Sequence, residues 1–396
     1  MFGALRREKG KCNMQDFILT AEQKDLVAVA KDFAERELAP VVEDCDAKGE
    51  FPMDVYKKFV EQGFSTMFIP EAYGGIGAGA LDLVLVNEQF AKVDAGFIVS
   101  ATTAEFGVTP LRIAGTEEQI KYYFERVMDG QLGAFCLTEA DAGSDASATR
   151  TTAVRDGDDY ILNGSKCFIS SGGIADMFTV FAVTDKEKGA HGISCFLVEK
   201  EREGVGVGKE ENKMGLRLSN TTSLSFDDVR VPAKNLIGEE GQGFMIAMQS
   251  LDRSRGVNSY GCLGIAERAI DEATKYAMVR RTFGKPIIKN QGISFMLADM
   301  EIQTTAARTL LYHCADMIDK TGQYDTRLGS VTKTFVSDVA MKVTTDAVQI
   351  LGGYGYSKEY PVEKLMRDAK IFQIFEGTNQ IQRMVIGREM QRRYKV

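Results

Sequence analysis

Phe178-Thr-Val-Phe-Ala-Val183 and Gly192-Ile-Ser-Cys-Phe-Leu-Val198 are two of the short apolar runs that decide the fold of this chain. Runs of this length, rich in β-branched and aromatic residues and bounded by turn residues, are typical of β-strands. Between Leu132 and Gly238 we find three more, at Gly133-Ala-Phe-Cys-Leu-Thr138, Tyr160-Ile-Leu-Asn-Gly164 and Thr222-Ser-Leu-Ser-Phe226. This block predicts a compact antiparallel β domain.

The sequence on both sides of this block has helical periodicity. Thr20-Ala-Glu-Gln23 is a capping-box signature that predicts a long helix reaching Val42. From Phe244 onward helical periodicity returns, with breaks at Gly284-Lys-Pro286, Gly322 and Gly352-Gly353 that are typical of a helical bundle. We therefore predict an α+β multidomain chain with an N-terminal extension (1–16), an N-terminal all-α domain (17–131), a middle antiparallel β domain (132–242) and a C-terminal four-helix bundle (243–396).

Composition narrows the function. The net charge of −8 and the lack of a basic run argue against nucleic acid as a partner, and no 18-residue apolar stretch predicts a membrane span. Seven scattered cysteines without a C-x-x-C pair favour a reducing compartment. Only two histidines occur, so no metal site is predicted, and acid/base chemistry has to rely on carboxylates or an organic cofactor. Residues 1–13 are basic without an apolar core; we expect a dispensable extension before Met14, with a mitochondrial transit remnant as the alternative.

A candidate base lies in Ile371-Phe-Gln-Ile-Phe-Glu-Gly-Thr-Asn-Gln-Ile-Gln-Arg383. Glu376 follows an apolar run and has no basic residue within four positions, so burial would raise its pKa toward the range of a general base. Gly377 lets the backbone approach a bound molecule, and Thr378 can cap a helix over 380–391. The alternative is an exposed helix end.

Three other segments combine glycine or small residues with polar groups. Gly74-Gly-Ile-Gly-Ala-Gly79 lacks the preceding strand and the later acidic residue of a dinucleotide-binding loop, so we interpret it as a turn before a helix at Leu81. The 135–145 loop can direct N–H groups and hydroxyls toward an oxygen-rich ligand. In the 166–173 segment, Phe168 can stack on a ring and Ser170 can hydrogen-bond it. Simple strand-to-loop turns remain the alternative for both segments.

Six further stretches occur in a characteristic order: Thr138-Glu-Ala-Asp-Ala-Gly-Ser-Asp145, Phe168-Ile-Ser170, Arg280-Arg-Thr-Phe-Gly284, Gln349-Ile-Leu-Gly-Gly-Tyr-Gly-Tyr356, Met366-Arg-Asp368 and Phe375-Glu-Gly-Thr378. With these stretches the chain resembles the acyl-CoA dehydrogenases from about Phe17 to Arg393. The resemblance implies the same α, β, α order and a homotetramer, a dimer of dimers, with one FAD per subunit.

The resemblance also implies roles for individual residues. Glu376 resembles the base that removes the α-proton of an acyl-CoA thioester while the β-hydrogen leaves as hydride to the flavin. Its backbone N–H and a ribityl hydroxyl would stabilise the developing enolate. The implied flavin contacts are Phe135, Cys136, Leu137, Thr138, Gly143, Ser144, Phe168, Ile169, Ser170, Thr378 and Gln380; those for the phosphates or adenine are Arg280, Arg281, Thr282, Phe283 and Gln291, with Gln349, Ile350, Gly352 and Gly353 from a neighbouring subunit. The implied substrate contacts are Ser144, Asp252, Arg255, Phe375 and Gly377.

Three positions refine the resemblance. Some branches place the base at the position of Ser254 and have glycine in place of Glu376, so this chain resembles the short- and medium-chain type. Phe168 stands where several mitochondrial members have tryptophan, which favours a bacterial, cytoplasmic protein over one of the mitochondrial matrix. Glu105 lies in the stretch that resembles the floor of the acyl pocket, where it would read a polar or cationic acyl tail; a surface or ion-paired Glu is the alternative.

The sequence thus predicts FAD-dependent α,β-dehydrogenation of a short- or medium-chain acyl-CoA to the trans-2-enoyl-CoA, with electrons passed to an electron-transfer flavoprotein. An enoyl-CoA reductase of the acrylyl, aryl-acrylyl or crotonyl type, working with a bifurcating flavoprotein, stays open. An acyl-CoA oxidase would usually have an additional domain, and the acidic charge disfavours a non-catalytic DNA-associated member of the fold. A glutaryl-CoA type would need a cation in 97–107, which has none.

Overall fold

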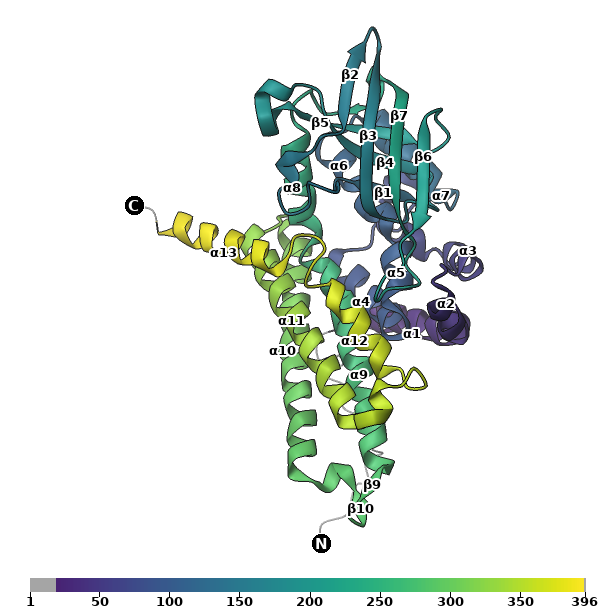
Figure 1. Ribbon diagram of the computed structural model, residues 1–396, viewed down its shortest axis with the longest axis vertical. Coiled ribbons are helices and arrows are strands. Elements are labelled where there is room, and N and C mark those ends of the chain that lie inside the picture. The colour runs from purple at the N-terminus through teal and green to yellow at the C-terminus, as the bar shows by residue number, and fades with distance from the viewer. Residues whose placement is uncertain (1–18, 395–396) are drawn as a thin grey trace.

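The computed structural model describes residues 19–394. A sheet forms one end of the molecule and a bundle of long helices the other, with the first helices packed beside their junction (Figure 1). The predicted order of helical, β and helical parts is therefore confirmed. The predicted extension at 1–16 and its dispensable start lie outside the described residues, and the exact domain boundaries stay predictions.

The N-terminal part is all helical. Thr20 and Gln23 form the predicted capping box, with each side chain bonded to the other residue's backbone. The helix predicted to reach Val42 passes through a π-helical turn and a 3₁₀ turn before continuing to Lys48. No strand forms at Met67–Pro70, and the glycine-rich segment is a loop, as predicted. The helices are α1 (Ala21–Phe33), α2 (Val42–Lys48), α3 (Met53–Glu61), α4 (Ala80–Val93), α5 (Ala95–Ala101), α6 (Thr103–Ala114) and α7 (Glu117–Met128).

The middle part is an eight-stranded sheet in the order β6-β7-β3-β2-β4-β5-β8, with β1 paired to β4. The expectation of a wholly antiparallel sheet is wrong, because β1 runs parallel to β4 and one pair joins β2 and β4 in parallel. Leu132, just before β1, bonds Asp176, just before β4, so both strands enter the sheet from the same edge. The strands are β1 (Gly133–Cys136), β2 (Thr152–Asp156), β3 (Asp159–Ser170), β4 (Met177–Val183), β5 (Ile193–Glu199), β6 (Val205–Glu210), β7 (Thr221–Pro232) and β8 (Leu236–Ile237).

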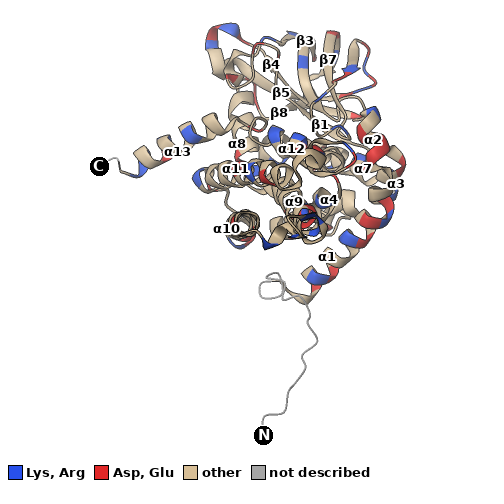
Figure 2. Ribbon diagram, turned by 60° about the horizontal axis from the view of Figure 1, so that its bottom comes forward, with Lys and Arg blue, Asp and Glu red and all other residues tan. Residues whose placement is uncertain are grey.

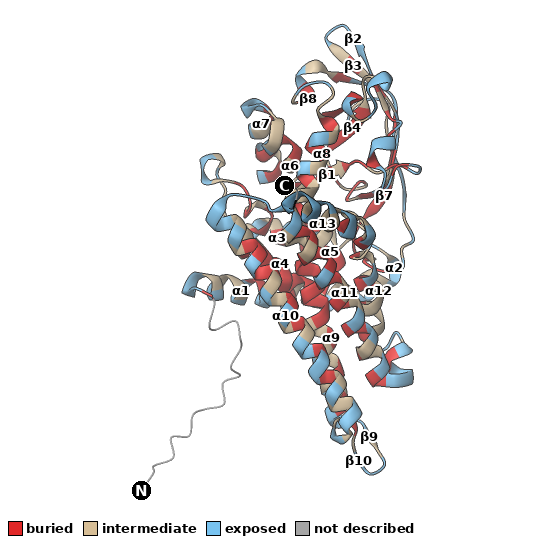
Figure 3. Ribbon diagram, turned by 90° about the vertical axis from the view of Figure 1, so that its left-hand side faces the viewer, coloured by how far each residue is buried: buried red, intermediate tan, exposed pale blue. Residues whose placement is uncertain are grey.

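The C-terminal part is the predicted helical bundle. Buried side chains concentrate where α4 packs on its central helices (Figure 3). None of the helices among residues 19–394 is long and apolar enough to cross a membrane. The elements are α8 (Gly243–Ser254), α9 (Tyr260–Val279), a small hairpin of β9 (Arg281–Thr282) and β10 (Lys285–Pro286), α10 (Gln291–Thr321), α11 (Thr326–Leu351), α12 (Val362–Ile371) and α13 (Asn379–Arg393), which projects from the bundle (Figure 1).

Acidic and basic residues are interspersed along the outer helices α1 to α3 (Figure 2). A different set of charged side chains, buried at the junction, holds the three parts together. At the junction, the Lys364 ammonium on α12 bonds both Asp94 before α5 and Asp368 on α12. Asp368 also accepts the backbone N–H of Leu216 from the middle part, at 2.7 Å. Burial alone would lower the pKa of Lys364, but the two carboxylates raise it overall, so the cation stays charged and ties the parts together.

Candidate active site

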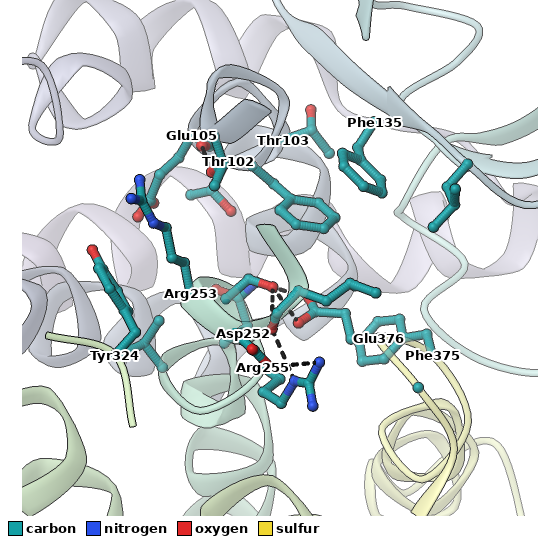
Figure 4. A pocket seen from close by; sticks show the side chains of 18 of the residues that line it. Thr102, Thr103, Glu105, Phe135, Asp252, Arg253, Arg255, Tyr324, Phe375 and Glu376 are labelled. Atoms are coloured by element: carbon teal, nitrogen blue, oxygen red, sulfur yellow. Dashed lines mark hydrogen bonds and ion pairs between the residues drawn. The ribbon is translucent and has the colours of Figure 1, made fainter. Parts of the chain in front are cut away.

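A cavity of about 880 Å³ opens where the three parts meet. Its walls include α4, α6, the loop after β1, the end of β3, α8, the turn between α12 and α13, and the first turns of α13. Figure 4 shows Glu376 and Phe375 on one side of this cavity, and Arg253 and Tyr324 toward the other. The Arg253 guanidinium lies 5.3 Å from the centre of the Tyr324 ring.

Glu376 stands in a backbone conformation that side-chain-bearing residues seldom adopt. Its φ is +53° and that of Gly377 is +87°, so two left-handed residues follow one another. The left-handed φ explains the glycine at 377, and a Cβ there would also meet the Gln382 amide nitrogen at 2.6 Å. Thr378 caps α13 as predicted, accepting from the N–H of Ile381 at 3.2 Å. This turn directs the Glu376 side chain back into the cavity.

The Glu376 carboxylate is held by two neutral donors. Ser254 Oγ donates to one carboxylate oxygen at 3.1 Å, and Asn258 Nδ2 donates to the other at 2.8 Å. Burial raises the pKa of Glu376, and these two hydrogen bonds oppose the rise, with smaller help from Lys333 and Arg255. The alternative of an exposed helix end is wrong, because the side chain is partly buried and faces the cavity.

Two buried cations, Lys333 and Arg255, lie next to the turn that carries Glu376 but form no hydrogen bond or ion pair with its carboxylate. Lys333 on α11 donates to the Gly377 carbonyl at 2.8 Å and to Asn379 Oδ1 at 2.7 Å, and burial lowers its pKa to about 8. Arg255 bonds Gln382 and pairs with Asp252 at 3.0 Å. Neither Lys333 nor Asn258 was predicted from the sequence, since neither lies near Glu376 in the chain.

One wall of the cavity carries most of the predicted flavin contacts. Phe168 has a φ of +56° and is 66% exposed, and Phe135 stacks on Phe106 with ring centres 4.4 Å apart. The side chain of Cys136 is fully buried and does not line the cavity, because alternate residues of β1 face opposite sides of the sheet. The predicted flavin contacts that line this wall are Phe135, Leu137, Thr138, Gly143, Ser144, Phe168, Ile169 and Ser170.

A buried ion pair supports that wall. Lys166 Nζ lies 2.7 Å from a Glu139 carboxylate oxygen and donates to the Leu137 carbonyl at 3.1 Å. Glu139 also accepts the N–H groups of Arg150 and Thr151, at 2.7 and 3.0 Å. This pair therefore fixes the loop that follows β1.

The residues predicted for the phosphates and adenine lie elsewhere in the same chain. A second hollow of about 710 Å³ is found near the β9–β10 hairpin, at the far end of the bundle from the sheet (Figure 1). Phe283 beside it is 98% exposed. Arg280, Thr282, Ile350, Gly352 and Gly353 line this hollow, whereas Arg281, Phe283, Gln291 and Gln349 line neither cavity. Thr378 and the exposed Gln380 do not line the first cavity either. One chain alone therefore does not bring all these residues together.

The predicted substrate contacts surround Glu376. Ser144, Asp252, Arg255, Phe375 and Gly377 all line the first cavity. The guanidinium of Arg255 is nevertheless largely occupied by protein groups, and Asp252 accepts a hydrogen bond from Thr326 at 2.9 Å.

Glu105 on α6 also lines the cavity, with a side chain that is partly buried. Its carboxylate forms no hydrogen bond or ion pair with any residue in the described part of the chain. Burial raises its pKa to about 7; Arg112 opposes the rise and Glu376 adds to it. The alternative of a surface or ion-paired Glu105 is therefore not what the structure shows, and a role in reading the acyl tail stays a prediction.

Glu376 in its left-handed turn and the aromatic, hydroxyl-bearing wall thus line one cavity in a chain of α, β, α order. The chain belongs to the acyl-CoA dehydrogenase family: it matches the models of the N-terminal domain at 20–131, the middle domain at 134–229 and the C-terminal domain at 241–391. This confirms the predicted family, its three-part fold, the class of oxidoreductase acting on acyl-CoA, and FAD as the family's cofactor.

Similar proteins bear this out. "Acyl-CoA dehydrogenase, short-chain specific" of Megasphaera elsdenii is 47% identical over 94% of this chain and 98% of that protein. "Acryloyl-CoA reductase (NADH)" of Anaerotignum propionicum is 45% identical over 98% and 99%. A solved structure described as "Electron transferring flavoprotein of Acidaminococcus fermentans: Towards a mechanism of flavin-based electron bifurcation" matches with a TM-score of 0.92 at 47% identity, covering 95% of this chain and 100% of that one.

Proposed function

We propose that this protein dehydrogenates a short- or medium-chain acyl-CoA to the trans-2-enoyl-CoA, with Glu376 as the base that takes the α-proton. The observation that carries this proposal is the Glu376 carboxylate, which faces the cavity and, among residues 19–394, is bonded only to the neutral donors Ser254 and Asn258. A base of this kind needs a pKa above that of a solvated carboxylate, and burial provides that direction.

The turn that carries Glu376 also offers a donor for the thioester oxygen. The α-proton becomes removable only if the charge that develops on that oxygen is stabilised. Among residues 19–394, the backbone N–H of Glu376 has no hydrogen-bond acceptor. This N–H is therefore free to bind the thioester oxygen next to the carboxylate that removes the proton.

The residues of the opposite wall fit FAD. Phe168 presents an exposed ring, and the hydroxyls of Thr138 and Ser170 have no hydrogen-bond partner in the described part of the chain, so they are free to bind the polar edge of a flavin. When bound there, FAD supplies the acceptor for the β-hydride. The Lys166–Glu139 pair keeps this wall in place.

We propose a homotetramer, a dimer of dimers, as the family resemblance implies; the second hollow lies far from Glu376 in the same chain, which supports a contribution from another copy. A neighbouring copy that brings Arg280, Thr282 and Gly353 to the first cavity would complete the site for the phosphates and adenine. The exposed Phe283 and Tyr356, at 98% and 87%, support burial of this end against another subunit.

An electron-transfer flavoprotein is the partner that we propose for the electrons, in the cytoplasm of a bacterium. The similarity to a chain in the bifurcating-flavoprotein work supports this partner. Reduction of an enoyl-CoA is the second candidate function, and the 45% identity with the acryloyl-CoA reductase favours keeping it. The same residues serve either direction, because Glu376 takes up the α-proton in dehydrogenation and returns it to the α-carbon in reduction.

Anaerobic titration of the FAD-loaded protein tests the proposal. Acetyl-, butyryl-, octanoyl- and phenylpropionyl-CoA are added in turn while the visible flavin absorbance is recorded. We expect one acyl-CoA to bleach the flavin in the wild type and not in Glu376→Gln. A protein that cannot be loaded with FAD would contradict the proposal. If the flavin resists every acyl-CoA but its reduced form is reoxidised by an enoyl-CoA, the reductase direction is supported.

A further inference from the structure

Asn258 is a polar side chain placed directly against the proposed base. It lies in the 3₁₀ turn Val257–Ser259, which connects α8 to α9, and it lines the same cavity. Its amide Nδ2 lies 2.8 Å from one Glu376 carboxylate oxygen, and Ser254 Oγ lies 3.1 Å from the other. Each oxygen of the base thus has its own donor.

The backbone that carries both donors is packed tightly. A Cβ added to Gly256, midway between Ser254 and Asn258, would meet Cys314 Sγ at 2.9 Å and the Gly329 Cα at 3.1 Å. The segment therefore packs directly on α10 and α11 at Gly256. The two donors are held in place by the bundle rather than by the ligand.

We propose that Asn258 acts through the base: together with Ser254 it keeps the Glu376 carboxylate ionised inside an otherwise desolvating cavity. This inference rests on the proposed role of Glu376. An ionised carboxylate has about four lone-pair sites. Two donors therefore leave sites on both oxygens free to accept the α-proton without breaking either hydrogen bond.

Neutral donors suit this task better than a cation would. A contacting ammonium or guanidinium would lower the pKa of Glu376 strongly and weaken it as a base. The nearby cations Arg255 and Lys333 act only through space, because their own hydrogen bonds go to Gln382, Gly377 and Asn379. The other titratable groups that act on Glu376 are Glu105 on α6 and Tyr260 and Cys262 on α9; burial keeps the tyrosine and the thiol neutral.

The test is the pH profile of flavin reduction in single turnovers of the FAD-loaded protein. In Asn258→Leu, a side chain of similar size removes the donor. We expect the midpoint of the acid limb to rise by about one pH unit, since a lost hydrogen bond to a charged group corresponds to a tenfold change or more. Above that midpoint the variant should match or exceed the wild-type rate, because its freed carboxylate is the stronger base.

Asn87→Leu is the matched control. Asn87 on α4 lines the same cavity, is buried, and among residues 19–394 forms no hydrogen bond with Glu376. The control therefore makes the same chemical change in the same cavity, and its midpoint should stay at the wild-type value. Ser254→Ala should raise the midpoint too, by a smaller amount, since its hydrogen bond is longer. An unchanged midpoint in Asn258→Leu, or a rate that falls by one factor at every pH, would overturn the inference.

Infrared difference titration separates this inference from the proposed function. The carboxyl stretching band that is lost in Glu376→Gln reports the protonation of Glu376 directly, without substrate turnover. The band should titrate at higher pH in Asn258→Leu than in the wild type. If the band shifts but no acyl-CoA reduces the wild-type flavin, the proposed function fails while the control of Glu376 protonation by Asn258 stands. If an acyl-CoA reduces the flavin and the band does not shift, the proposed function stands and the inference about Asn258 is overturned.

Discussion

Glu139 and Glu376 are two carboxylates close to the same cavity, and they are held in opposite ways. Glu139 touches the buried ammonium of Lys166 and also accepts two backbone N–H groups. Burial alone would raise the pKa of Glu139, but Lys166 and these donors lower it overall. In the described part of the chain, Glu376 accepts hydrogen bonds from two neutral donors only, and burial raises its pKa.

The difference shows which carboxylate is available for chemistry. A carboxylate with a contacting cation and backbone donors is stabilised as an anion and is a poor base, so Glu139 is suited to holding a loop. Two neutral donors offset only part of the free-energy cost of burying the charge. The pKa of Glu376 therefore stays raised, and the carboxylate is suited to taking a proton. Both are glutamates in buried surroundings, and their partners alone separate the two roles.

Replacing Glu376 by Gln should have the largest effect. The amide keeps the size of the side chain but cannot accept the proton, so flavin reduction by an acyl-CoA should slow by about 10²–10⁴-fold or more. FAD content should be unchanged, because the flavin wall does not include this side chain. Stopped-flow absorbance checks the rate, and a variant that reduces its flavin at the wild-type rate would remove the distinction between the two glutamates.

Replacing Lys166 by Met should destabilise the protein without touching the base. Glu139 would be left buried without its cation, which costs about 3–5 kcal/mol. We expect a lower apparent melting temperature and weaker retention of FAD, since Lys166 also bonds the Leu137 carbonyl in the flavin wall. The double variant Lys166→Met/Glu139→Gln is the control: it should recover part of the lost stability, and no recovery would mean that the charge of Glu139 is not the cause.

Glu105→Gln should produce a smaller effect that depends on pH. The pKa of Glu105 rises from about 4.5 when unfolded to about 7 when folded, so the folded protein binds more protons between these values and its stability falls as pH rises through this window. A glutamine at position 105 does not ionise, so the variant does not lose this stability as pH rises. At pH 8 it should be more stable than the wild type by about 1–3 kcal/mol, and near pH 4.5 the gain should vanish. Melting curves at both pH values check this.

The acyl-tail role of Glu105 should give the smallest effect. If its unpaired carboxylate reads a polar or cationic tail, Glu105→Ala should lower kcat/KM for polar acyl-CoAs relative to plain ones by about tenfold, the worth of one hydrogen bond to a charged group. The comparison is made on paired acyl-CoAs that differ only in the tail. An unchanged preference would show that Glu105 affects stability and not selection.

Local patterns in the sequence predicted much of the fold. The capping box at Thr20, the breaks at Gly322 and Gly352 and the apolar runs of β4 and β5 each lie within a few residues, and the structure contains them. The strands β2, β6 and β8 escaped prediction; β6 alternates with glycine and is largely exposed, so its apolar pattern is weak. The parallel pairing of β1 depends on the edge at which the chain enters the sheet, which no local pattern encodes.

In the candidate site too, residues marked by a local pattern were predictable and residues brought together by long-range packing were not. Glu376 was predictable because its apolar run and glycine stand next to it in the chain. Asn258 and Lys333 were not, because 118 and 43 positions separate them from Glu376 and only the packing of α8, α9 and α11 brings them together. The position of Arg280 and Gly353 at the far hollow also depends on helix lengths in the bundle, which no local pattern encodes; only the family resemblance implied that Gly353 serves a neighbouring subunit.

Relocating the base tests the central claim most directly. Ser254 Oγ lies 3.1 Å from the Glu376 carboxylate, so a glutamate at 254 can reach the same part of the cavity. Flavin reduction by the acyl-CoA that bleaches the wild type is measured in Glu376→Gly and in Glu376→Gly/Ser254→Glu. The account predicts that the single variant is inert and that the double variant regains part of the wild-type rate. A single variant that reduces its flavin as fast as the wild type would contradict it.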